Sequence, residues 1–266
     1  MTQTTTGTDL AGKALFDLSG RVAVVTGSGR GLGRVLATGL AQAGAAVVTC
    51  SRTLEQAEST AAGIRDAGGR AVAVRTDTSD PAAAKALVAT AVEEYGQLDV
   101  LVNNAGIDAI EPSEDVTVEH WREVLDVNLG GYFHCAQAAG RHMLERGSGS
   151  IVNISSIAGR VGIAGLTSYS AAKGGVDQLT KVLAVEWATR GVRVNAVAPG
   201  YLQNLMEGTG DAHHNPAKQT QVTTFTPMAR RAALEEIVGP VVFLASDAAS
   251  YVTGAVLYVD GGYTAA

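Results

Sequence analysis

Short apolar segments alternate with longer amphipathic segments along almost the whole chain, and this alternation is what most restricts its fold. Seven segments read as short strands buried on both faces: residues 21–26, 45–50, 70–76, 98–104, 149–155, 192–198 and 255–262. Six segments between them have apolar residues at helical spacing: residues 31–44, 53–68, 81–96, 118–147, 168–191 and 234–249. Right-handed helical crossovers between parallel strands predict an α/β fold with a doubly wound parallel sheet of about seven strands and helices on both faces.

Composition limits the class of protein further. The net charge of −6 gives no reason to expect nucleic acid or a membrane as a partner, and no linker or low-complexity run divides the chain. We therefore expect a single domain at residues 18–266, preceded by a flexible threonine-rich tail at residues 1–17 that resembles neither a signal peptide nor an anchor. Cys50 and Cys135 lie far apart without metal-ligand spacing, which favours a cytoplasmic protein without a disulfide framework.

The segment VVTGSGRGLGR, residues 24–34, places four glycines at alternating positions after the first predicted strand. It fails the dinucleotide pattern GxGxxG, which would need glycine at Leu32 or at Arg34, and it lacks the lysine of a P-loop. A glycine turn between a strand and a helix still offers backbone N–H groups to an anion, and the missing Cβ atoms permit close approach. The alternative is a tight turn that only needs positive φ.

Polar side chains and turn residues also lie at the ends of the other predicted strands. They are Ser51 and Arg52, Asp77, Asn103 to Gly106, Ser155 and Ser156, and Pro199 and Gly200. Ligands of doubly wound sheets bind beyond the carboxyl ends of the strands, so these residues predict a ligand site at one edge.

Tyr169 and Lys173 stand four residues apart at the start of a predicted helix, so they share one helical face. A nearby ammonium favours the phenolate and lowers the pKa of the tyrosine, as a general acid/base near neutral pH requires. Taken alone, the same spacing also fits a surface pair without a function.

Together these motifs resemble the short-chain dehydrogenase/reductase family, over nearly the whole chain after the tail. The family's motifs fall in order on TGxxxGxG at Thr26–Gly33, NNAG at Asn103–Gly106, a catalytic asparagine at Asn128, YxxxK at Tyr169–Lys173 and Pro-Gly at Pro199–Gly200. The family's catalytic serine, thirteen residues before the tyrosine, selects Ser156. The resemblance implies a Rossmann-type fold, a homotetramer, and hydride transfer between a nicotinamide cofactor and a carbonyl/alcohol pair.

The resemblance also implies a role for each site residue. Tyr169 donates the proton, Ser156 polarises the carbonyl oxygen, Lys173 contacts the nicotinamide ribose and tunes Tyr169, and Asn128 anchors a water relay. The implied cofactor-binding residues are Gly27, Ser28, Arg30, Gly31, Leu32, Gly33, Ser51, Arg52, Asp77, Asn104, Ala105, Gly106, Tyr169, Lys173, Pro199 and Gly200. Gly29 becomes a variable position of the motif.

Two further details concern residues outside these motifs. Asn204 stands where the family often has a threonine that bonds the nicotinamide amide. No metal is expected, because the adjacent His213 and His214 lack a third ligand.

The residues that end the second predicted strand indicate whether the cofactor carries a 2′-phosphate. NAD-preferring proteins place Asp or Glu about 20 residues after the glycine loop, but no acid lies between Gly33 and Glu55, and Ser51 stands at that place. Arg52 follows it, and Arg30 lies inside the loop. A hydroxyl and guanidinium groups bind a 2′-phosphate that a carboxylate would repel, so we expect NADP(H) to be preferred, with NAD(H) as the alternative.

Residues 201–231 form a long segment, predicted to be irregular, at the active edge, where such segments act as lids. Their polar character favours a small or polar substrate, such as a sugar acid or a 3-oxoacyl compound, and the pattern is similar to gluconate dehydrogenases and 3-oxoacyl-carrier-protein reductases. Two other functions remain open. One is a non-catalytic NADP-binding sensor, and the other is an enzyme of this fold that uses the cofactor for epimerisation or dehydration.

Overall fold

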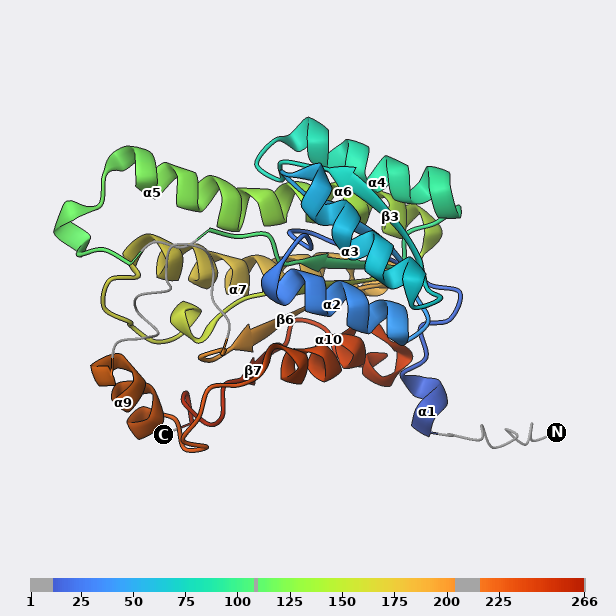
Figure 1. The fold of residues 1–266 in the computed structure, drawn as a ribbon. Coiled ribbons are helices and arrows are strands. Elements are labelled where there is room, and N and C mark those ends of the chain that lie inside the picture. Colours follow the sequence, from blue (N-terminus) through green and yellow to red (C-terminus); the bar gives the residue numbers. More distant parts are fainter. Residues whose placement is uncertain (1–11, 108–109, 204–215, 266) are drawn as a thin grey trace.

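The computed structural model of the chain describes residues 12–107, 110–203 and 216–265 (Figure 1). All seven predicted strands are present: β1 (Val22–Val25), β2 (Ala46–Ser51), β3 (Arg70–Arg75), β4 (Val100–Asn103), β5 (Gly149–Ile154), β6 (Val192–Pro199) and β7 (Val256–Val259). They form one parallel sheet in the order β3-β2-β1-β4-β5-β6-β7. The chain thus starts near the middle, winds to one edge, crosses back and winds to the other, so the predicted doubly wound fold is confirmed.

Helices cover both faces of the sheet (Figure 1). One face packs against α2 (Gly31–Gln42), α3 (Leu54–Asp66) and α10 (Val238–Ala245), and the other against α4 (Pro81–Tyr95), α6 (Gly131–Arg146) and α7 (Thr167–Trp187). Strand β1 shows why its sequence is apolar throughout, because Ala23 and Val25 belong to the first core while Val22 and Val24 belong to the second.

Short 3₁₀ segments lie in the connections: η1 (Ser113–Asp115), η3 (Ile157–Gly159), η4 (Ala188–Arg190), η5 (Leu234–Ile237) and η6 (Asp247–Ala249). Within the segment expected to be a flexible tail, a short helix α1 (Gly12–Leu15) is present, and the ring centroid of Phe16 lies 6.4 Å from that of Phe243 on α10. Residues 1–11 of that segment lie outside the described residues.

The segment predicted as one helix at residues 118–147 is divided. It consists of α5 (Val118–Leu125), a π-helical turn (Asp126–Gly130) and α6. The π turn contains Asn128, whose side chain is fully buried. Such turns occur frequently at functional sites, since they place one side chain out of the helical register.

Part of the predicted substrate segment is helical. Helix α9 (Pro216–Phe225) occupies part of residues 201–231, so the prediction of an irregular segment is wrong for these residues. Pro216 stands at the first position of the helix, where a proline is compatible with helical geometry. Asn204, His213 and His214 lie outside the described residues.

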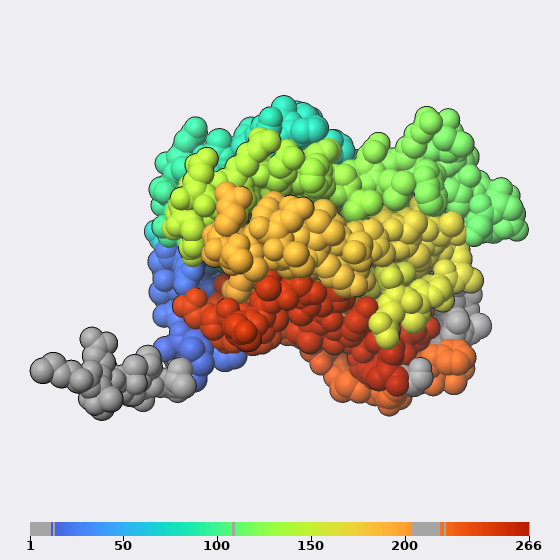
Figure 2. All heavy atoms as spheres, turned by 180° about the vertical axis from the view of Figure 1, so that it is seen from behind, coloured from blue at the N-terminus to red at the C-terminus, as the bar shows by residue number. Residues whose placement is uncertain are grey.

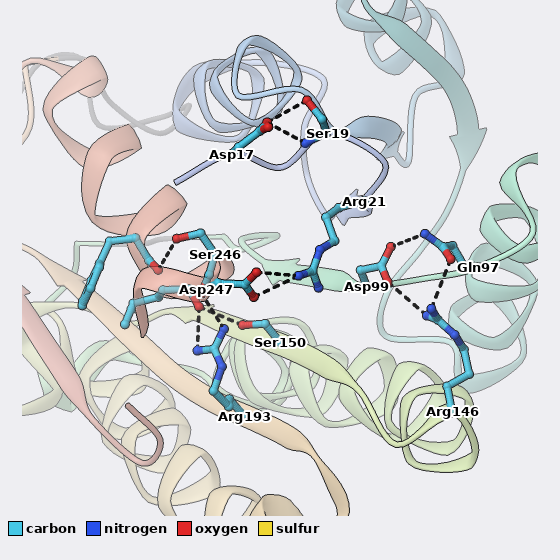
Figure 3. Close-up of polar contacts among 12 residues, drawn as sticks. Asp17, Ser19, Arg21, Gln97, Asp99, Arg146, Ser150, Arg193, Ser246 and Asp247 are labelled. Atoms are coloured by element: carbon cyan, nitrogen blue, oxygen red, sulfur yellow. Dashed lines mark hydrogen bonds and ion pairs between the residues drawn. The ribbon is translucent and has the colours of Figure 1, made fainter. Parts of the chain in front are cut away.

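Polar contacts close the amino ends of the strands (Figure 3). Arg21 Nη2 lies 2.9 Å from Asp247 Oδ1, which joins the start of β1 to η6. The buried carboxylate of Asp99 accepts from Arg146 Nη1 at 3.1 Å and from Gln97 Nε2 at 2.8 Å. These charges hold elements of the fold together at the amino ends of the strands. The predicted site lies at the opposite, carboxyl ends.

Candidate active site

A cavity of about 490 Å³ lies at the carboxyl ends of the strands, which is a volume typical of small-molecule sites. Of the predicted cofactor-binding residues, all but Ser28 line it: Gly27, Arg30, Gly31, Leu32, Gly33, Ser51, Arg52, Asp77, Asn104, Ala105, Gly106, Tyr169, Lys173, Pro199 and Gly200. Ser156 lines the same cavity. The structure therefore brings the glycine loop together with Ser156, Tyr169 and Lys173 around one space, whereas the fourth predicted catalytic residue, Asn128, does not line it.

The three glycines of TGxxxGxG each have a separate geometric reason. Gly27 has φ +65°, and a Cβ there would lie 2.8 Å from Ala105 Cα. Gly31 has φ +53°, and a Cβ on Gly33 would lie 2.2 Å from the carbonyl oxygen of Gly27. The loop thus turns tightly into the first turn of α2, whose residues Gly31, Leu32 and Gly33 line the cavity.

Gly29 is also constrained, although the sequence pattern indicates a variable position. A Cβ on Gly29 would lie 2.8 Å from Gln56 Cβ and 3.2 Å from Ser51 Cβ. Although Gly29 occupies a variable position of the motif, a side chain there has little room in this chain, because α3 packs directly against the loop.

We expect Gly33→Ala to disrupt the loop, since the added Cβ meets backbone that has little freedom to move. The expected losses are roughly 1–3 kcal/mol of the free energy of unfolding and most of the affinity for NADPH, measured by urea denaturation and by fluorescence titration. Gly63→Ala is the matched control, because a Cβ there has open space within α3 and gains up to about 1 kcal/mol. Equal affinity of both variants for NADPH would contradict the assigned role of Gly33.

Helix α7 places Tyr169 and Lys173 on one face, as the spacing predicts. Lys173 Nζ lies 5.4 Å from the ring centroid of Tyr169 and donates to the carbonyl oxygen of Ile154 at 2.8 Å. The lysine side chain is buried, whereas Tyr169 is half-buried and lines the cavity. Ser156 stands at the N-cap of η3, where its Oγ accepts from Ala158 N at 3.1 Å. A hydroxyl, a phenol and a cation thus line the same cavity.

Comparison with known proteins agrees with this geometry. A family model described as Enoyl-(Acyl carrier protein) reductase matches residues 26–264. Cis-4-hydroxycyclohexanecarboxylate dehydrogenase of Sinomonas cyclohexanicum is 49% identical over 248 residues, covering 92% of this chain and 97% of the relative. Gluconate 5-dehydrogenase of Gluconobacter oxydans is 40% identical over 250 residues, covering 94% and 97%. The crystal structure of a gluconate 5-dehydrogenase from Burkholderia cenocepacia in complex with NADP and tartrate has a TM-score of 0.92 at 39% identity, covering 96% and 99%.

The chain belongs to the short-chain dehydrogenase/reductase family. It is therefore an NAD(P)-dependent oxidoreductase of CH–OH and C=O groups, and the motifs at the carboxyl edge of its sheet are those of the family. The predicted family membership and reaction class are confirmed.

The surroundings of two residues of this dehydrogenase/reductase differ from those expected from the sequence. Ser28 is fully buried, and its Oγ donates to the carbonyl oxygen of Val25 and accepts from Cys50 N, each at 2.8 Å. It therefore joins β1 to β2 and does not line the cavity. Thr26 was not among the predicted site residues, yet its Oγ1 accepts from the backbone N–H groups of Asn104 at 2.9 Å and Ala105 at 3.0 Å. The threonine of TGxxxGxG was the available signal.

The side-chain amide of Asn128 hydrogen-bonds to the main chain of Ile107. Its Oδ1 accepts from Ile107 N and its Nδ2 donates to Ile107 O, each at 2.8 Å. The side chain thus fixes the segment after NNAG on the π turn and does not line the cavity. The role of Asn128 in a water relay stays a prediction.

The hydroxyl groups of Ser155 and Ser156 have different hydrogen-bond partners. Ser155 Oγ donates to Asp177 Oδ1 at 2.5 Å, and both residues are buried. Ser155 lines the cavity as Ser156 does, but its hydroxyl is engaged by Asp177, which supports Ser156 as the catalytic serine. Burial raises the pKa of the Asp177 carboxyl above its ordinary value, against the opposing hydrogen bond from Ser155.

The raised pKa of Asp177 predicts a pH-dependent stability. Between the ordinary pKa of an aspartate and the raised pKa of Asp177, the folded protein holds a proton that the unfolded chain releases. The free energy of unfolding therefore falls as pH rises through this interval. Asp177→Asn keeps an oxygen that accepts from Ser155 and carries no charge. We expect the free energy of unfolding of the variant, relative to the wild type, to increase as pH rises above the ordinary pKa of an aspartate, about 3.9, as measured by urea denaturation. A constant or decreasing difference would contradict this account.

The charges around the cavity fit a phosphate-bearing cofactor. Among the described residues that line it, Asp77 is the one acid, and Arg30, Arg52 and Lys173 are the cations. Asp77 Oδ1 accepts from Ser79 Oγ at 2.7 Å and from Ser79 N at 3.0 Å. The Ser79 hydroxyl, with a smaller effect of the Arg52 charge, holds the pKa of Asp77 below its ordinary value.

Two features are absent from the described residues. No helix there combines the length and the apolar character needed to cross a membrane. No group of three or more His, Cys, Asp or Glu residues is placed there to hold a metal ion.

Proposed function

We propose that this enzyme transfers hydride between NADP(H) and the secondary alcohol or ketone of a small hydroxy- or oxo-carboxylate. The observation that carries the proposal is that one cavity is lined both by the glycine loop and by Ser156, Tyr169 and Lys173. Substrate and cofactor bound in this cavity would bring their reacting carbons together beside the phenol.

NADP(H) is the proposed cofactor. The N–H groups of the glycine loop would hold the pyrophosphate, while Ser51, Arg52 and Arg30 would hold the 2′-phosphate. Supporting this choice, the Burkholderia cenocepacia relative was crystallised with NADP. When bound, the nicotinamide supplies or accepts the hydride.

The chain's own residues would move the proton and orient the substrate. In reduction, Tyr169 Oη donates its proton to the carbonyl oxygen as that oxygen gains negative charge, and the phenolate is reprotonated from solvent. Ser156 Oγ hydrogen-bonds the same oxygen and stabilises the developing charge. The Lys173 ammonium favours the phenolate form of Tyr169 between these steps. In oxidation the same groups act in reverse.

The substrate class is inferred from the relatives and the cavity wall. Cis-4-hydroxycyclohexanecarboxylate and gluconate, named in two of the relatives, are both secondary alcohols that carry a carboxylate. Ile107, Val127 and Leu202 contribute apolar side chains to the cavity, which suits the carbon skeleton of such a substrate. A 3-oxoacyl compound is the second candidate class.

A substrate panel tests the proposal. Cis-4-hydroxycyclohexanecarboxylate, gluconate and an acetoacetyl thioester are each incubated with the oxidised or reduced cofactor, and absorbance is followed at the reduced-nicotinamide band. Turnover with a hydroxy acid and NADP⁺ is the expected result. Cofactor binding without turnover across the panel would favour a sensor, and substrate conversion without net change of the cofactor would favour epimerisation or dehydration.

We propose further that the enzyme is a cytoplasmic homotetramer. Helix α7 is exposed along the face shown in Figure 2, between α6 and the C-terminal segment. On this helix Val185 is 81% exposed and Val182 is 45% exposed, so apolar surface is available for a second copy. Light scattering should give four times the chain mass of 27.2 kDa, and a monomeric mass would overturn the assignment.

A further inference from the structure

Tyr132 lies in the first turn of α6, four residues after Asn128, and its side chain is 1% exposed. Its Oη donates to the carbonyl oxygen of Ile154 at 2.9 Å and accepts from Lys173 Nζ at 3.0 Å. Lys173 Nζ donates to the same carbonyl oxygen at 2.8 Å. Phenol, ammonium and carbonyl thus form a closed triangle between α6, α7 and β5.

The triangle meets the physical needs of a buried ammonium. Lys173 is 3% exposed, and a cation out of water is stable only where acceptors surround it. The Tyr132 ring adds an attraction, since its centroid lies 4.6 Å from Lys173 Nζ. Burial, together with the proximity of Tyr169 and Cys135, raises the pKa of Tyr132 well above its ordinary value. Its hydroxyl therefore stays protonated and both donates and accepts.

We propose that Tyr132 is a positioning residue, whose hydroxyl fixes the Lys173 ammonium beside the phenol of Tyr169. Tyr132 itself does not line the cavity, so it acts through Lys173 and not on the substrate. The kinetic consequence rests on the proposed function, whereas the effect on Lys173 does not.

The backbone of Tyr132 is fixed by the same region of the fold. Asn103 Nδ2 donates to Tyr132 O at 3.2 Å and to Asn153 Oδ1 at 3.0 Å. Asn153 Nδ2 in turn donates to Thr180 Oγ1 on α7 at 2.9 Å. Asn103 and Asn153 are paired in the register of β4 and β5. A buried row of amides therefore connects the start of α6 to the helix that carries Tyr169 and Lys173.

Three titratable groups face Lys173 from the elements packed around it. Tyr169 lies one turn before it and Asp177 one turn after it on α7, and Tyr132 approaches from α6. The end of β5 contributes the Ile154 carbonyl, and Ser155, which follows the strand, donates to the main-chain oxygen of Lys173; neither group titrates. Tyr132→Phe keeps the ring and removes one acceptor, so the ammonium form of Lys173 becomes less favourable and its place less fixed.

The first experiment measures the pH dependence of kcat for alcohol oxidation, where Tyr169 must lose its proton. In Tyr132→Phe we expect the rising limb to move up by about one pH unit and kcat at neutral pH to fall about ten-fold. Ser150→Ala is the matched control, because it removes a buried hydroxyl that donates to Leu244 O at 2.9 Å, at the other end of β5. A purely structural role for Tyr132 would lower the stability of both variants and leave both pH profiles unchanged, which would overturn the proposal.

The second experiment needs no substrate. The five lysines of the chain are observed by ¹⁵N NMR, and Lys173→Met assigns the Lys173 signal. In Tyr132→Phe the midpoint of the Lys173 titration should move to lower pH, while Ser150→Ala leaves it in place. An unchanged midpoint would overturn the role of Tyr132 even in an active enzyme. If the wild type turns over no substrate, the proposed function fails, and this titration still decides the role of Tyr132.

Discussion

Tyr169→Phe is expected to lower kcat by roughly 100- to 10,000-fold, the range for loss of a general acid/base, while NADPH affinity stays within a few-fold of the wild type. The variant keeps the ring that lines the cavity and lies 5.4 Å from Lys173 Nζ, but it has no proton to give to the substrate oxygen. Initial rates at the reduced-nicotinamide band and fluorescence titration of NADPH measure the two quantities.

Tyr95→Phe is the control for this substitution. Tyr95 lies at the end of α4 under the guanidinium of Arg70 and does not line the cavity, so its phenol should be dispensable for turnover. A near-normal kcat in Tyr169→Phe would contradict the assignment of Tyr169 as the general acid/base. Loss of NADPH binding together with activity would show that the ring supports the cofactor site as well.

Seven strands could be predicted from the sequence because each has a short, largely apolar core, and β1 (Val22–Val25), which is buried on both faces, is apolar at every position. The site could be predicted because parallel strands bring their carboxyl ends to one edge, so residues after separate strands, such as Ser51 and Ser156, line one cavity. Both inferences depend on periodicity and chain order, which a sequence displays directly.

What the sequence did not display depends on contacts between distant segments. The π turn at Asn128 is fixed by Ile107, which lies 21 residues earlier, while apolar spacing continues through the turn as in an ordinary helix. Gly29 is constrained by Gln56 on α3, and Ser28 is held by Cys50 on β2. None of these partners follows from the local pattern.

Two further features were visible but ambiguous in the sequence. Helix α9 begins at Pro216, which is a start signal, but threonines at 220, 223 and 224 disfavour a helix. Tyr132 has the pattern of a core aromatic residue, and only the fold shows that its hydroxyl meets Lys173, 41 residues later.

The cofactor's 2′-phosphate provides the second large effect. Ser51 ends β2, is half-buried, lines the cavity, and its Oγ accepts from Thr53 N at 3.2 Å. Ser51→Asp puts a carboxylate at this place, which repels the 2′-phosphate of NADPH and accepts from the ribose 2′-hydroxyl of NADH. We expect the ratio of the two dissociation constants to change by about 100-fold in favour of NADH, equivalent to about 3 kcal/mol.

Fluorescence titration of each cofactor measures this ratio, and Ser59→Asp is the matched control. Ser59 is exposed on α3 and does not line the cavity, so the same added charge there should leave the ratio near its wild-type value. An unchanged ratio in Ser51→Asp would mean that the 2′-phosphate lies elsewhere and that Arg30 and Arg52 are surface charges. A change confined to Ser51→Asp would instead identify the end of β2 as the place where this enzyme distinguishes NADPH from NADH.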